Sequence, residues 1–579
     1  MNVRFVRFFF VSVFMLVAML APQRVFATER YGPLQVSGSL ETQNLLRHPD
    51  IDQWSFIQQR NTLRLRFDLD IIKDNVGTLG FAFPGIRSAN AYLLYRPVYD
   101  SVFDIQPGGR ADLFPYGRGE KDNSLHAFTS SVRDSIRETN GGLNAFREAY
   151  LDVALSEIPV SFRLGRQQVV WGESDNFRLL DRVNPLDFSW HFQQESWDNI
   201  RIPLWMVKGL YRFGDIGPFS EGFFEGFWDL GDWVPAKKNF LPYPWGVPID
   251  NPFTDEATCT DPNNSFTCKD YKFLKGVPFR RGGYDKNPID NGQWGARIVF
   301  NTPQGVQMGL HYFYTRFPGD DGSQPTFLRA VDQTQPFGPG ATSTNNLVSI
   351  GNGVLPAEVI YPYVHTVGLS ANYAEDEYTQ TVYRLETIYQ LDLPFSDLRK
   401  AQKITNPSCL GSPSPVPCAL APELPDGLFG TTKADMWNGM VGFDRPTWIR
   451  LINGRSTVLI TGQFFWHRII QDSSHFLGSL SAADKVREWE ILTTLSASTF
   501  MGPGGKDVPL VFVALDPVNH YNLEVGWKND YFVTNNFIVT LFQNYFVVPN
   551  FGGEVDETWG IGGLFKKRDE TGVRVTYQF

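Results

Sequence analysis

The residues best suited to catalysis form no recognisable catalytic motif in this 579-residue chain. Its eight histidines never occur in the H-E-x-x-H spacing that binds zinc from one helix face. The chain also lacks the G-x-S-x-G turn that presents a nucleophilic serine. We therefore expect no enzyme, no cofactor and no metal, and keep enzyme activity as a second alternative.

Charged side chains at every second position give a stronger signal. In residues 63–70, the even positions Arg64, Arg66, Asp68 and Asp70 are charged and the odd positions are apolar. Successive side chains of a strand point to opposite faces, so these four charges share one face. In a soluble sheet that face would meet water. In a transmembrane barrel it would line the lumen, where mixed charges either select solutes or pair and brace the wall.

The same alternation recurs along the chain. Arg297 lies in an alternating segment at 294–301, which a short turn joins to another at 306–314, as in a β-hairpin. Arg384 and Glu386 have the corresponding inward register in a later segment. Further candidate strands lie at 367–373, 383–391, 458–466, 489–499, 508–514, 523–527, 538–544 and 559–565. The full count is about sixteen strands, with 14 to 18 as the range allowed by this kind of pattern.

The first 27 residues predict a secretory signal peptide. Arg4 and Arg7 precede an apolar run at 8–21, and a small-x-small cleavage site follows at 25–27. The apolar run is shorter than the ~18 residues that a transmembrane helix needs. We expect cleavage after Ala27, which leaves residues 28–579 as one mature domain.

The other end of the chain resembles the closing strand of bacterial outer-membrane barrels. Residues 572–579, GVRVTYQF, are apolar on one face and end in Phe, the signature that the barrel-assembly machinery recognises. Connections also alternate between short turns and long polar loops, such as 317–359 and 393–435. The predicted fold is all-β: one large antiparallel transmembrane β-barrel in the cell outer membrane, with long extracellular loops.

Two pairs of cysteines lie in polar sequence rich in Pro, Ser, Asn and Thr. Eight residues separate the members of each pair, which predicts two local disulfides in an exported protein. Because C-x-x-C spacing and histidine partners are missing, a metal site is not expected. The predicted disulfides are Cys259–Cys268 and Cys409–Cys418.

Residues 171–245 combine many tryptophans with scattered charges. One hypothesis is that residues 172–200 fold inward as a constriction or plug, with Arg178, Asp181 and Arg182 near its narrowest point. Nearby aromatic residues would offer an apolar surface for an acyl or hydrocarbon ligand; they are Phe223, Phe224, Phe227 and Trp228. The alternative is an aromatic belt at the membrane interface together with a surface loop.

Four motifs resemble the family of proteobacterial proteins catalogued as domain of unknown function 1302. They are GRQQVVWGE at 165–173, VNPLD at 183–187, GFDRPTWIR at 442–450 and GQFFW at 462–466. The resemblance implies an outer-membrane barrel without an established catalytic residue. It also implies association with LolB-like periplasmic lipoproteins and with hydrophobe exporters of the resistance-nodulation-division type.

The predicted function is a porin-like outer-membrane channel for small or hydrophobic molecules. The alternative is a closed barrel that binds hydrophobes or lipid and works with a periplasmic lipid-transfer partner; an outer-membrane enzyme is the second alternative. Removing Arg4, Arg7 and Arg24 with the signal peptide changes the net charge from −10 to −13, which disfavours nucleic acid. Expected partners are outer-membrane lipid, the barrel-assembly machinery, and a periplasmic lipoprotein or hydrophobe exporter.

Overall fold

A computed structural model provides the structure of the chain. It describes residues 29–50, 53–101, 142–175, 177–188, 195–234, 237–238, 280–281, 292–317, 328–330, 347–350, 353–359, 363–397, 431–477, 487–518, 521–549, 565 and 568–579. The predicted signal peptide, both predicted disulfides and candidate-strand residues 559–564 lie outside these ranges.

The main sheet has 22 strands, and eighteen of them form a closed antiparallel ring once the short strands β1, β4, β6 and β23 are set aside. Each ring strand pairs with the next, and the last pairs with the first. This confirms the predicted barrel, with a strand count at the upper end of the predicted range. The ring strands are β2 (Leu34–Asp50), β3 (Gln53–Lys73), β5 (Ile86–Tyr95), β7 (Phe146–Leu155), β8 (Val160–Gln167), β10 (Leu204–Ile216), β11 (Phe219–Asp229), β14 (Trp294–Asn301), β15 (Val306–Arg316), β19 (Tyr363–Glu375), β20 (Thr381–Asp397), β21 (Thr431–Thr447), β22 (Val458–Ile469), β24 (Trp489–Ser498), β25 (Asp507–Asp516), β26 (Asn522–Phe532), β27 (Phe537–Val547) and β28 (Asp569–Gln578).

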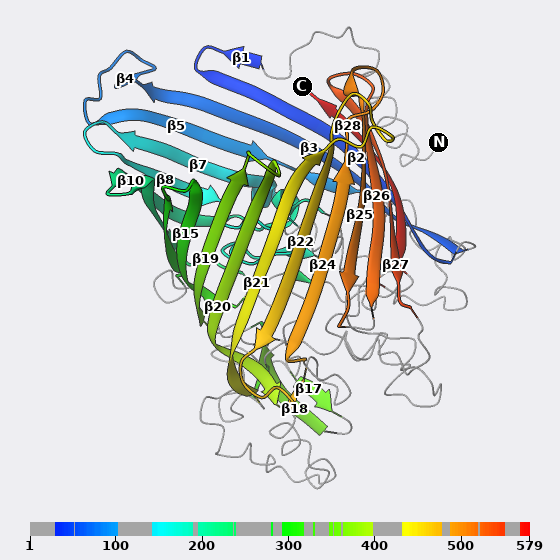
Figure 1. The fold of residues 1–579 in the computed structure, drawn as a ribbon. Coiled ribbons are helices and arrows are strands. Elements are labelled where there is room, and N and C mark those ends of the chain that lie inside the picture. The colour runs from blue at the N-terminus through cyan, green and yellow to red at the C-terminus, as the bar shows by residue number, and fades with distance from the viewer. Residues whose placement is uncertain are drawn as a thin grey trace, which may run out of the picture.

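The two ends of the ring differ. Tight turns at 217–218, 302–305 and 533–536 join strands at one end, and connections such as 168–203 and 317–362 join them at the other. Figure 1 shows the hairpin turns at the upper ends of the green to orange strands, while the small sheet with β17 (Leu347–Ile350) and β18 (Gly353–Val359) lies beyond the lower ends. We call these the short-turn end and the long-loop end.

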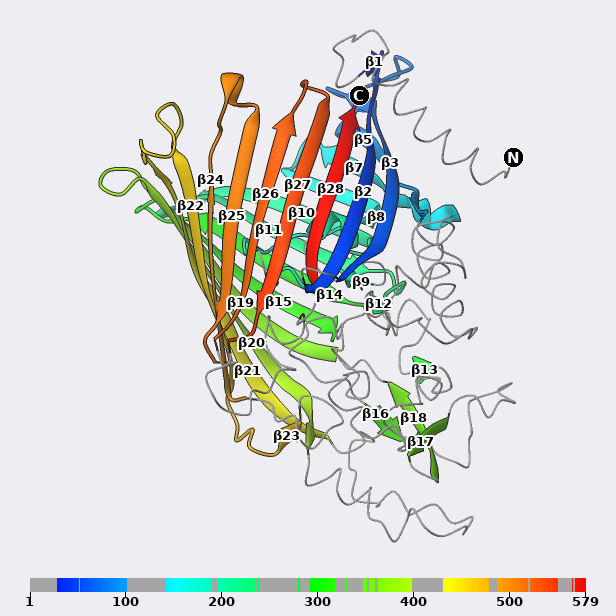
Figure 2. The ribbon, with the colours of Figure 1, turned by 90° about the vertical axis from the view of Figure 1, so that its right-hand side faces the viewer.

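The seam of the ring lies between β28 and β2, which Figure 2 shows side by side in red and blue. Ten residue pairs join them, from Ser39 opposite Gln578 to His48 opposite Asp569. Two further main-chain hydrogen bonds, of 2.7 and 2.9 Å, link Gly38 and Phe579 at the short-turn end. The seam is therefore as fully paired as the rest of the wall.

The outer face of the strands is apolar and carries two rows of aromatic side chains. Near the long-loop end, Trp228, Trp294, Tyr314 and His365 lie opposite one another on four successive strands. A second row of exposed rings lies toward the short-turn end: Tyr373, Tyr383 and Phe443. The rows are eight residue positions apart on β19, from His365 to Tyr373, which is roughly 26 Å along the tilted strand. Such rows match the aromatic girdles of membrane barrels.

One predicted long loop is shorter at both ends than the sequence suggests. The segment 393–435 was expected to be a long loop, but β20 continues to Asp397 and β21 already begins at Thr431. Leu393, Phe395 and Phe476 are buried in a small core beyond the ring, where the rings of Phe395 and Phe476 stack. Burial of these apolar side chains explains why both strands extend past the membrane-spanning part.

Shorter elements complete the described chain. No helix in the described ranges is both long and apolar enough to cross a membrane. The remaining elements are β1 (Glu29–Tyr31), β4 (Val76–Gly77), β6 (Val98–Asp100), η3 (Gly142–Ala145), β9 (Asp187–Phe188), α4 (Trp197–Ile200), β12 (Lys237–Lys238), β13 (Arg280–Arg281), β16 (Leu328–Ala330), β23 (Phe476–Leu477) and η6 (Pro503–Gly505).

Candidate functional site

The connection from β8 to β10 passes through the interior of the ring. We call residues 168–203 the inner segment; 168–175, 177–188 and 195–203 are described. Its Glu195 binds Arg60 of β3, while its Leu180 N–H binds Glu386 of β20. β3 and β20 are nine steps apart in either direction around the eighteen-strand ring. The inner segment therefore reaches across the lumen from one wall to the opposite wall.

Two charged residues of β20 bind residues 173–180, in the first half of the inner segment. The buried carboxylate of Glu386 accepts the main-chain N–H of Leu180 at 3.3 Å and the main-chain N–H of Glu173. Arg384 donates to the Glu173 carbonyl at 2.6 Å and to the Asp175 carboxylate at 2.7 Å. The sequence predicted both β20 residues to face the lumen, and here they bind the inner segment.

On the opposite wall, two arginines of β3 bind residues 195–199, near the C-terminal end of the inner segment. Arg60 faces Glu195 through two N–O contacts of 2.6 and 2.9 Å. Arg64, four residues further along the same face, donates to the side-chain oxygen of Asn199. Arg60 was not among the predicted lumen residues, although it continues the even-numbered register of Arg64 and Arg66.

The segment also buries apolar side chains against the wall. Trp171 packs against Phe227 of β11 and Phe313 of β15, with ring centroids 5.3 and 5.1 Å apart. Phe177 contacts Phe465 of β22 edge to face at 5.3 Å. The whole cluster comprises Val169, Trp171, Leu179, Leu180, Val183, Ile202, Leu204, Met206, Phe227, Trp233, Phe313, Ile388, Met440 and Phe465. A dry core thus occupies the interior between the segment and one side of the ring.

Three residues predicted to lie at a narrow point brace the segment internally. Arg178 donates to the carbonyls of Asp181 and Asn184, and the buried Arg182 donates to that of Leu179 at 2.9 Å. Asp181 is buried and binds Arg201 at 2.5 and 2.8 Å. The guanidinium groups of Arg178 and Arg182 thus bind main-chain carbonyls three to six residues away in the same segment. The contacts of these three residues shown here lie within the segment, and their position at the narrowest point of the lumen stays a prediction.

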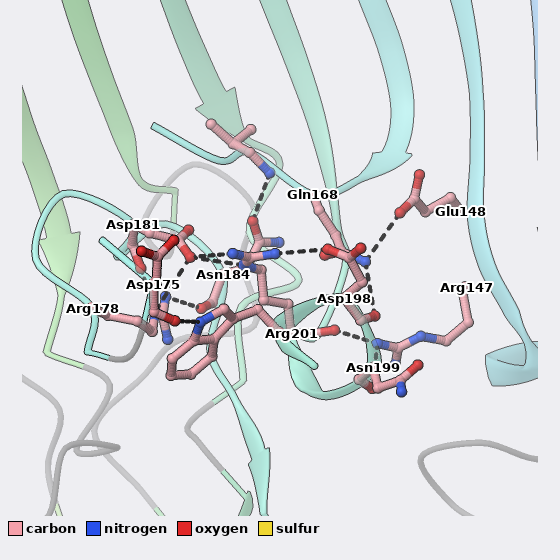
Figure 3. A network of polar contacts seen from close by, with 12 residues as sticks. Arg147, Glu148, Gln168, Asp175, Arg178, Asp181, Asn184, Asp198, Asn199 and Arg201 are labelled. Carbon is pink, nitrogen blue, oxygen red and sulfur yellow. Dashed lines mark hydrogen bonds and ion pairs between the residues drawn. The ribbon is translucent and has the colours of Figure 1, made fainter. Parts of the chain in front are cut away.

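Three arginines from different parts of the wall meet at Asn199. Arg96, which follows β5, donates to its main-chain oxygen at 2.9 Å and to its side-chain oxygen at 3.1 Å. Arg147 of β7 donates to the same main-chain oxygen at 3.2 Å, a contact drawn in Figure 3, and Arg64 donates to the side-chain oxygen. We call Arg64, Arg96 and Arg147 the arginine cluster.

The other predicted lumen residues occupy two further places. Arg297 of β14 binds Glu225 of β11 at 2.6 and 2.8 Å, and its guanidinium lies 5.1 Å from the Trp171 ring centroid. Arg66 pairs with Asp68 at 2.7 Å, with both side chains open to solvent. Asp70 lies 3.7 Å from Arg30 near the short-turn end.

The four aromatics predicted as one apolar ligand surface lie on opposite faces of β11. Phe224 and Trp228 are exposed on the outer face, whereas Phe227 is buried in the inner core and Phe223 faces Arg297. The two-residue alternation of a strand separates them. The prediction of a single surface is therefore wrong. Trp205 and Trp228 instead lie on the outer face, as the alternative of an aromatic belt expected.

The wall from β24 through β28 to β3 has a polar inner face. Toward the short-turn end, Lys528 and Asp530 pair at 2.8 Å and keep part of their side chains in solvent, as do Arg66 and Asp68. Thr540 lies opposite Asp530 and binds it at 2.6 Å. Other buried polar residues line the same wall nearer the long-loop end: Gln43, Gln58, Thr494, Asn522, Glu524, Asn544 and Glu570. Positive and negative side chains thus share the interior.

Several residues that hold the inner segment in place, on the wall or in the segment itself, escaped sequence reasoning. Arg96 and Arg147 come from separate stretches of the wall, while Glu195 and Asn199 lie four residues apart in the inner segment itself; none belongs to the motifs that the sequence displays. Only Arg60 had a usable signal, since it extends the register of residues 63–70. Within the described ranges, no group of three or more His, Cys, Asp or Glu side chains is placed to bind a metal ion.

Comparison with solved structures finds outer-membrane proteins of low identity. OccAB4 of Acinetobacter baumannii is 9% identical, with 94% of this chain and 98% of that chain covered and a TM-score of 0.39. OmpF of Salmonella typhi, in complex with daunomycin, is 9% identical over 95% of this chain and 100% of that chain, with a TM-score of 0.38. OpdK of Pseudomonas aeruginosa, with vanillate, is 7% identical over 94% and 98%, with a TM-score of 0.39. Similarity at this level says nothing about solute or mechanism.

Among curated proteins, none matches this chain in sequence. The family comparison is decisive, because one family model matches residues 52–579, which is nearly the whole chain. The motifs at 165–173, 183–187, 442–450 and 462–466 all fall within that match. The chain belongs to the family described as "Protein of unknown function (DUF1302)".

Proposed function

We propose that this protein is a passive outer-membrane channel for small solutes, with the inner segment as its constriction. The observation that carries the proposal is the inner segment itself, which joins β3 to β20 across the interior of a closed ring. A segment bound to both walls reduces the free cross-section at its own height. Solutes would pass between it and the polar wall from β24 to β3.

The charges of that wall support an aqueous passage. Arg66, Asp68, Lys528 and Asp530 keep between 24% and 54% of their side-chain surface in solvent. Ionised groups inside a membrane protein are stable where water or a partner charge surrounds them. Mixed charges on the wall would also set the ionic preference of the channel.

The outer face supports insertion in the outer membrane. Two aromatic rows bound an apolar band, and aromatic side chains favour the membrane–water interface. Short turns are periplasmic and long loops extracellular in such barrels. The inner segment would then enter the lumen from the extracellular side, and the β2–β28 seam would be closed with the help of the barrel-assembly machinery.

A closed hydrophobe-binding barrel is the rival. It requires inward apolar side chains that are free to contact a ligand. Phe227 and Phe313 instead pack against Trp171 of the inner segment, so the chain's own residues already cover them. This favours the channel. A periplasmic lipoprotein or hydrophobe exporter stays a candidate partner on family grounds alone.

The test is planar-bilayer conductance of refolded residues 28–579, compared with a variant that lacks residues 175–195. We expect steady, salt-dependent conductance from the first and a larger unitary conductance from the second. A variant with the equally long deletion 402–422 is the control, because it shortens another long connection and removes Cys409 and Cys418 together. Folding is checked by heat-modifiable mobility. Equal conductance of folded full-length chain and the 175–195 deletion would contradict the constriction.

A further inference from the structure

Four side chains form one continuous stack across the lumen face of β3, β5, β7 and β8. The rings of Tyr92 and Tyr150 are nearly parallel, with centroids 4.7 Å apart and an angle of 15° between their planes. The guanidinium carbon of Arg66 lies 5.1 Å from the Tyr92 centroid, and that of Arg163 lies 4.0 Å from the Tyr150 centroid. The strand register places the tyrosines in the lumen, because Tyr92 is opposite both Asp68 and Tyr150. We call Arg66, Tyr92, Tyr150 and Arg163 the lumen stack.

Each arginine of the lumen stack is paired with a carboxylate and still reaches water. Asp68 binds Arg66 at 2.7 and 3.3 Å, and Asp152 binds Arg163 at 2.7 and 2.9 Å. Both arginines use Nε and Nη2 in these pairs, which leaves Nη1 for another acceptor. The four charged side chains keep between 29% and 54% of their surface in solvent. Together they carry no net charge, yet they keep donors and acceptors open for further hydrogen bonds.

The tyrosine hydroxyls are a second set of open polar groups. Neither the Tyr92 nor the Tyr150 hydroxyl hydrogen-bonds to a described residue, and neither oxygen is buried. The ring faces, by contrast, are covered. Because β5 pairs with β3 on one side and β7 on the other, Tyr92 lies between Arg66 and Tyr150. Tyr150 in turn lies between Tyr92 and Arg163 of β8. The lumen stack therefore presents hydroxyl groups, and not ring faces, to a solute.

These open groups favour one class of solute. An aromatic solute would need a free ring face on which to stack, and both tyrosine faces are occupied. An ionic solute would meet, beside each charge that attracts it, the paired charge that repels it. A neutral solute with several hydroxyl groups can donate to the carboxylates and accept from the arginines and tyrosines without breaking either ion pair. The exposed chemistry therefore matches sugars and polyols.

The lumen stack adjoins the inner segment on its short-turn side. Arg64, two residues before the stack on the same face of β3, donates to Asn199 of the inner segment. On β7, Glu148 is the preceding lumen residue, and it accepts from Gln168 of the inner segment at 3.0 Å. A solute that passes the constriction toward the short-turn end would therefore meet the lumen stack next.

We propose that the lumen stack binds a neutral polyhydroxyl solute, of the sugar or polyol class, beside the constriction. The proposal rests on the channel function above, since the solute reaches the stack through the lumen. Its hydroxyl groups accept from the two tyrosines and from Nη1 of the arginines, and they donate to the oxygens of Asp68 and Asp152. Both ion pairs stay formed, so the solute can leave again without exposing an unpaired charge, as conduction requires.

The direct test measures binding, separately from conduction. Saturation-transfer NMR would follow maltose in titrations with folded residues 28–579 in lauryldimethylamine oxide micelles. Tetraethylene glycol dimethyl ether is the control solute, because it is neutral and polar but has no hydroxyl group. We expect a saturable signal from maltose and none from the ether. Glutarate, an anion without hydroxyl groups, should not displace maltose.

Two conservative variants remove one hydroxyl each and keep the ring. Tyr92→Phe and Tyr150→Phe are each expected to weaken maltose binding about three- to tenfold, since each loses one hydrogen bond to the solute. Tyr211→Phe is the matched control, because Tyr211 is 46% exposed on the outer face of β10, opposite Phe224. Its maltose binding should equal that of the parent chain.

Three outcomes overturn the proposal: equal signals from maltose and the ether, displacement of maltose by glutarate, or equal effects of the lumen variants and Tyr211→Phe. Circular dichroism and heat-modifiable mobility confirm that each variant is folded, and either lumen variant decides the matter if the other is not. Conductance separates this proposal from the channel. A conducting barrel without maltose binding overturns the site alone, while maltose binding in a silent barrel overturns the channel.

Discussion

The guanidinium of Arg60 on β3 and the carboxylate of Glu195 on the inner segment face each other across two contacts of 2.6 and 2.9 Å. Both side chains are 1% exposed. The pair is the counterpart of the Glu386 contacts on the opposite wall, so the inner segment is bound at two points rather than one. Each attachment can be tested separately.

Breaking the Arg60–Glu195 pair should be costly because the charge left behind stays buried. Arg60→Ala and Glu195→Ala are each expected to destabilise the folded protein by about 3–5 kcal/mol. The double variant should lose less than the sum of the two, since no buried charge lacks its partner. Urea unfolding followed by tryptophan fluorescence measures all three. Additive losses would mean that the two residues do not interact.

Removing the Glu386 carboxylate should loosen the other attachment. In Glu386→Ala, the main-chain N–H groups of Glu173 and Leu180 lose a buried acceptor, at about 1–3 kcal/mol for each group. We expect a larger or noisier unitary conductance in planar bilayers. Glu377→Ala, which alters an exposed carboxylate in a tight turn, should behave as the parent chain.

Trp171 should matter far more than an outer tryptophan of equal size. Trp171 is 3% exposed and contacts Phe227 and Phe313, so Trp171→Ala opens a cavity at a cost of about 3–5 kcal/mol. Trp205 is 48% exposed on the outer face, and Trp205→Ala should leave the inner core intact. Thermal unfolding in one detergent compares the two. A larger effect at Trp205 would place the stabilising contacts outside the ring.

Gly572 of β28 should tolerate no side chain. A Cβ there would lie 2.1 Å from Cζ of Phe542, whose ring covers this glycine from the neighbouring strand. Gly572→Ala should therefore displace the ring and cost about 1–3 kcal/mol. Gly454→Ala is the control, since a Cβ at that turn position meets nothing within 4 Å. Both are compared by the temperature at which heat-modifiable mobility is lost.

The sequence predicted some of the strands whose two faces differ in polarity, but it named no segment for β2, β5, β7, β8 or β21. Residues 63–70 alternate clearly because their inner face meets water or polar partners. β10 and β11 were missed, and their register explains why. Leu204, Met206 and Phe227 face inward but pack against the inner segment, so both faces of these strands carry apolar side chains. The alternation of apolar and polar residues therefore disappears where the inner face of a strand packs against the inner segment and does not meet water.

The candidate site was predictable only in part. A tryptophan-rich stretch with scattered charges identified residues 172–200 as a segment apart from the wall. Its binding partners could not be identified, because Arg60, Arg96 and Glu386 acquire their roles only when the ring brings distant strands together. A residue such as Arg147 looks like an ordinary strand charge until Asn199 lies beside it.

The seam between β2 and β28 also determines when the wall can be completed. Arg47 and Glu570, which pair across it, are 523 residues apart in the sequence. Every other ring strand pairs with neighbours that precede or follow it along the chain, so a growing sheet can add strands one at a time. Until β28 arrives, β2 and the most recent strand both present unpaired main-chain groups, which can pair with other chains. The final pairing therefore removes both exposed edges in one step, and the period before it is when this protein is most open to aggregation.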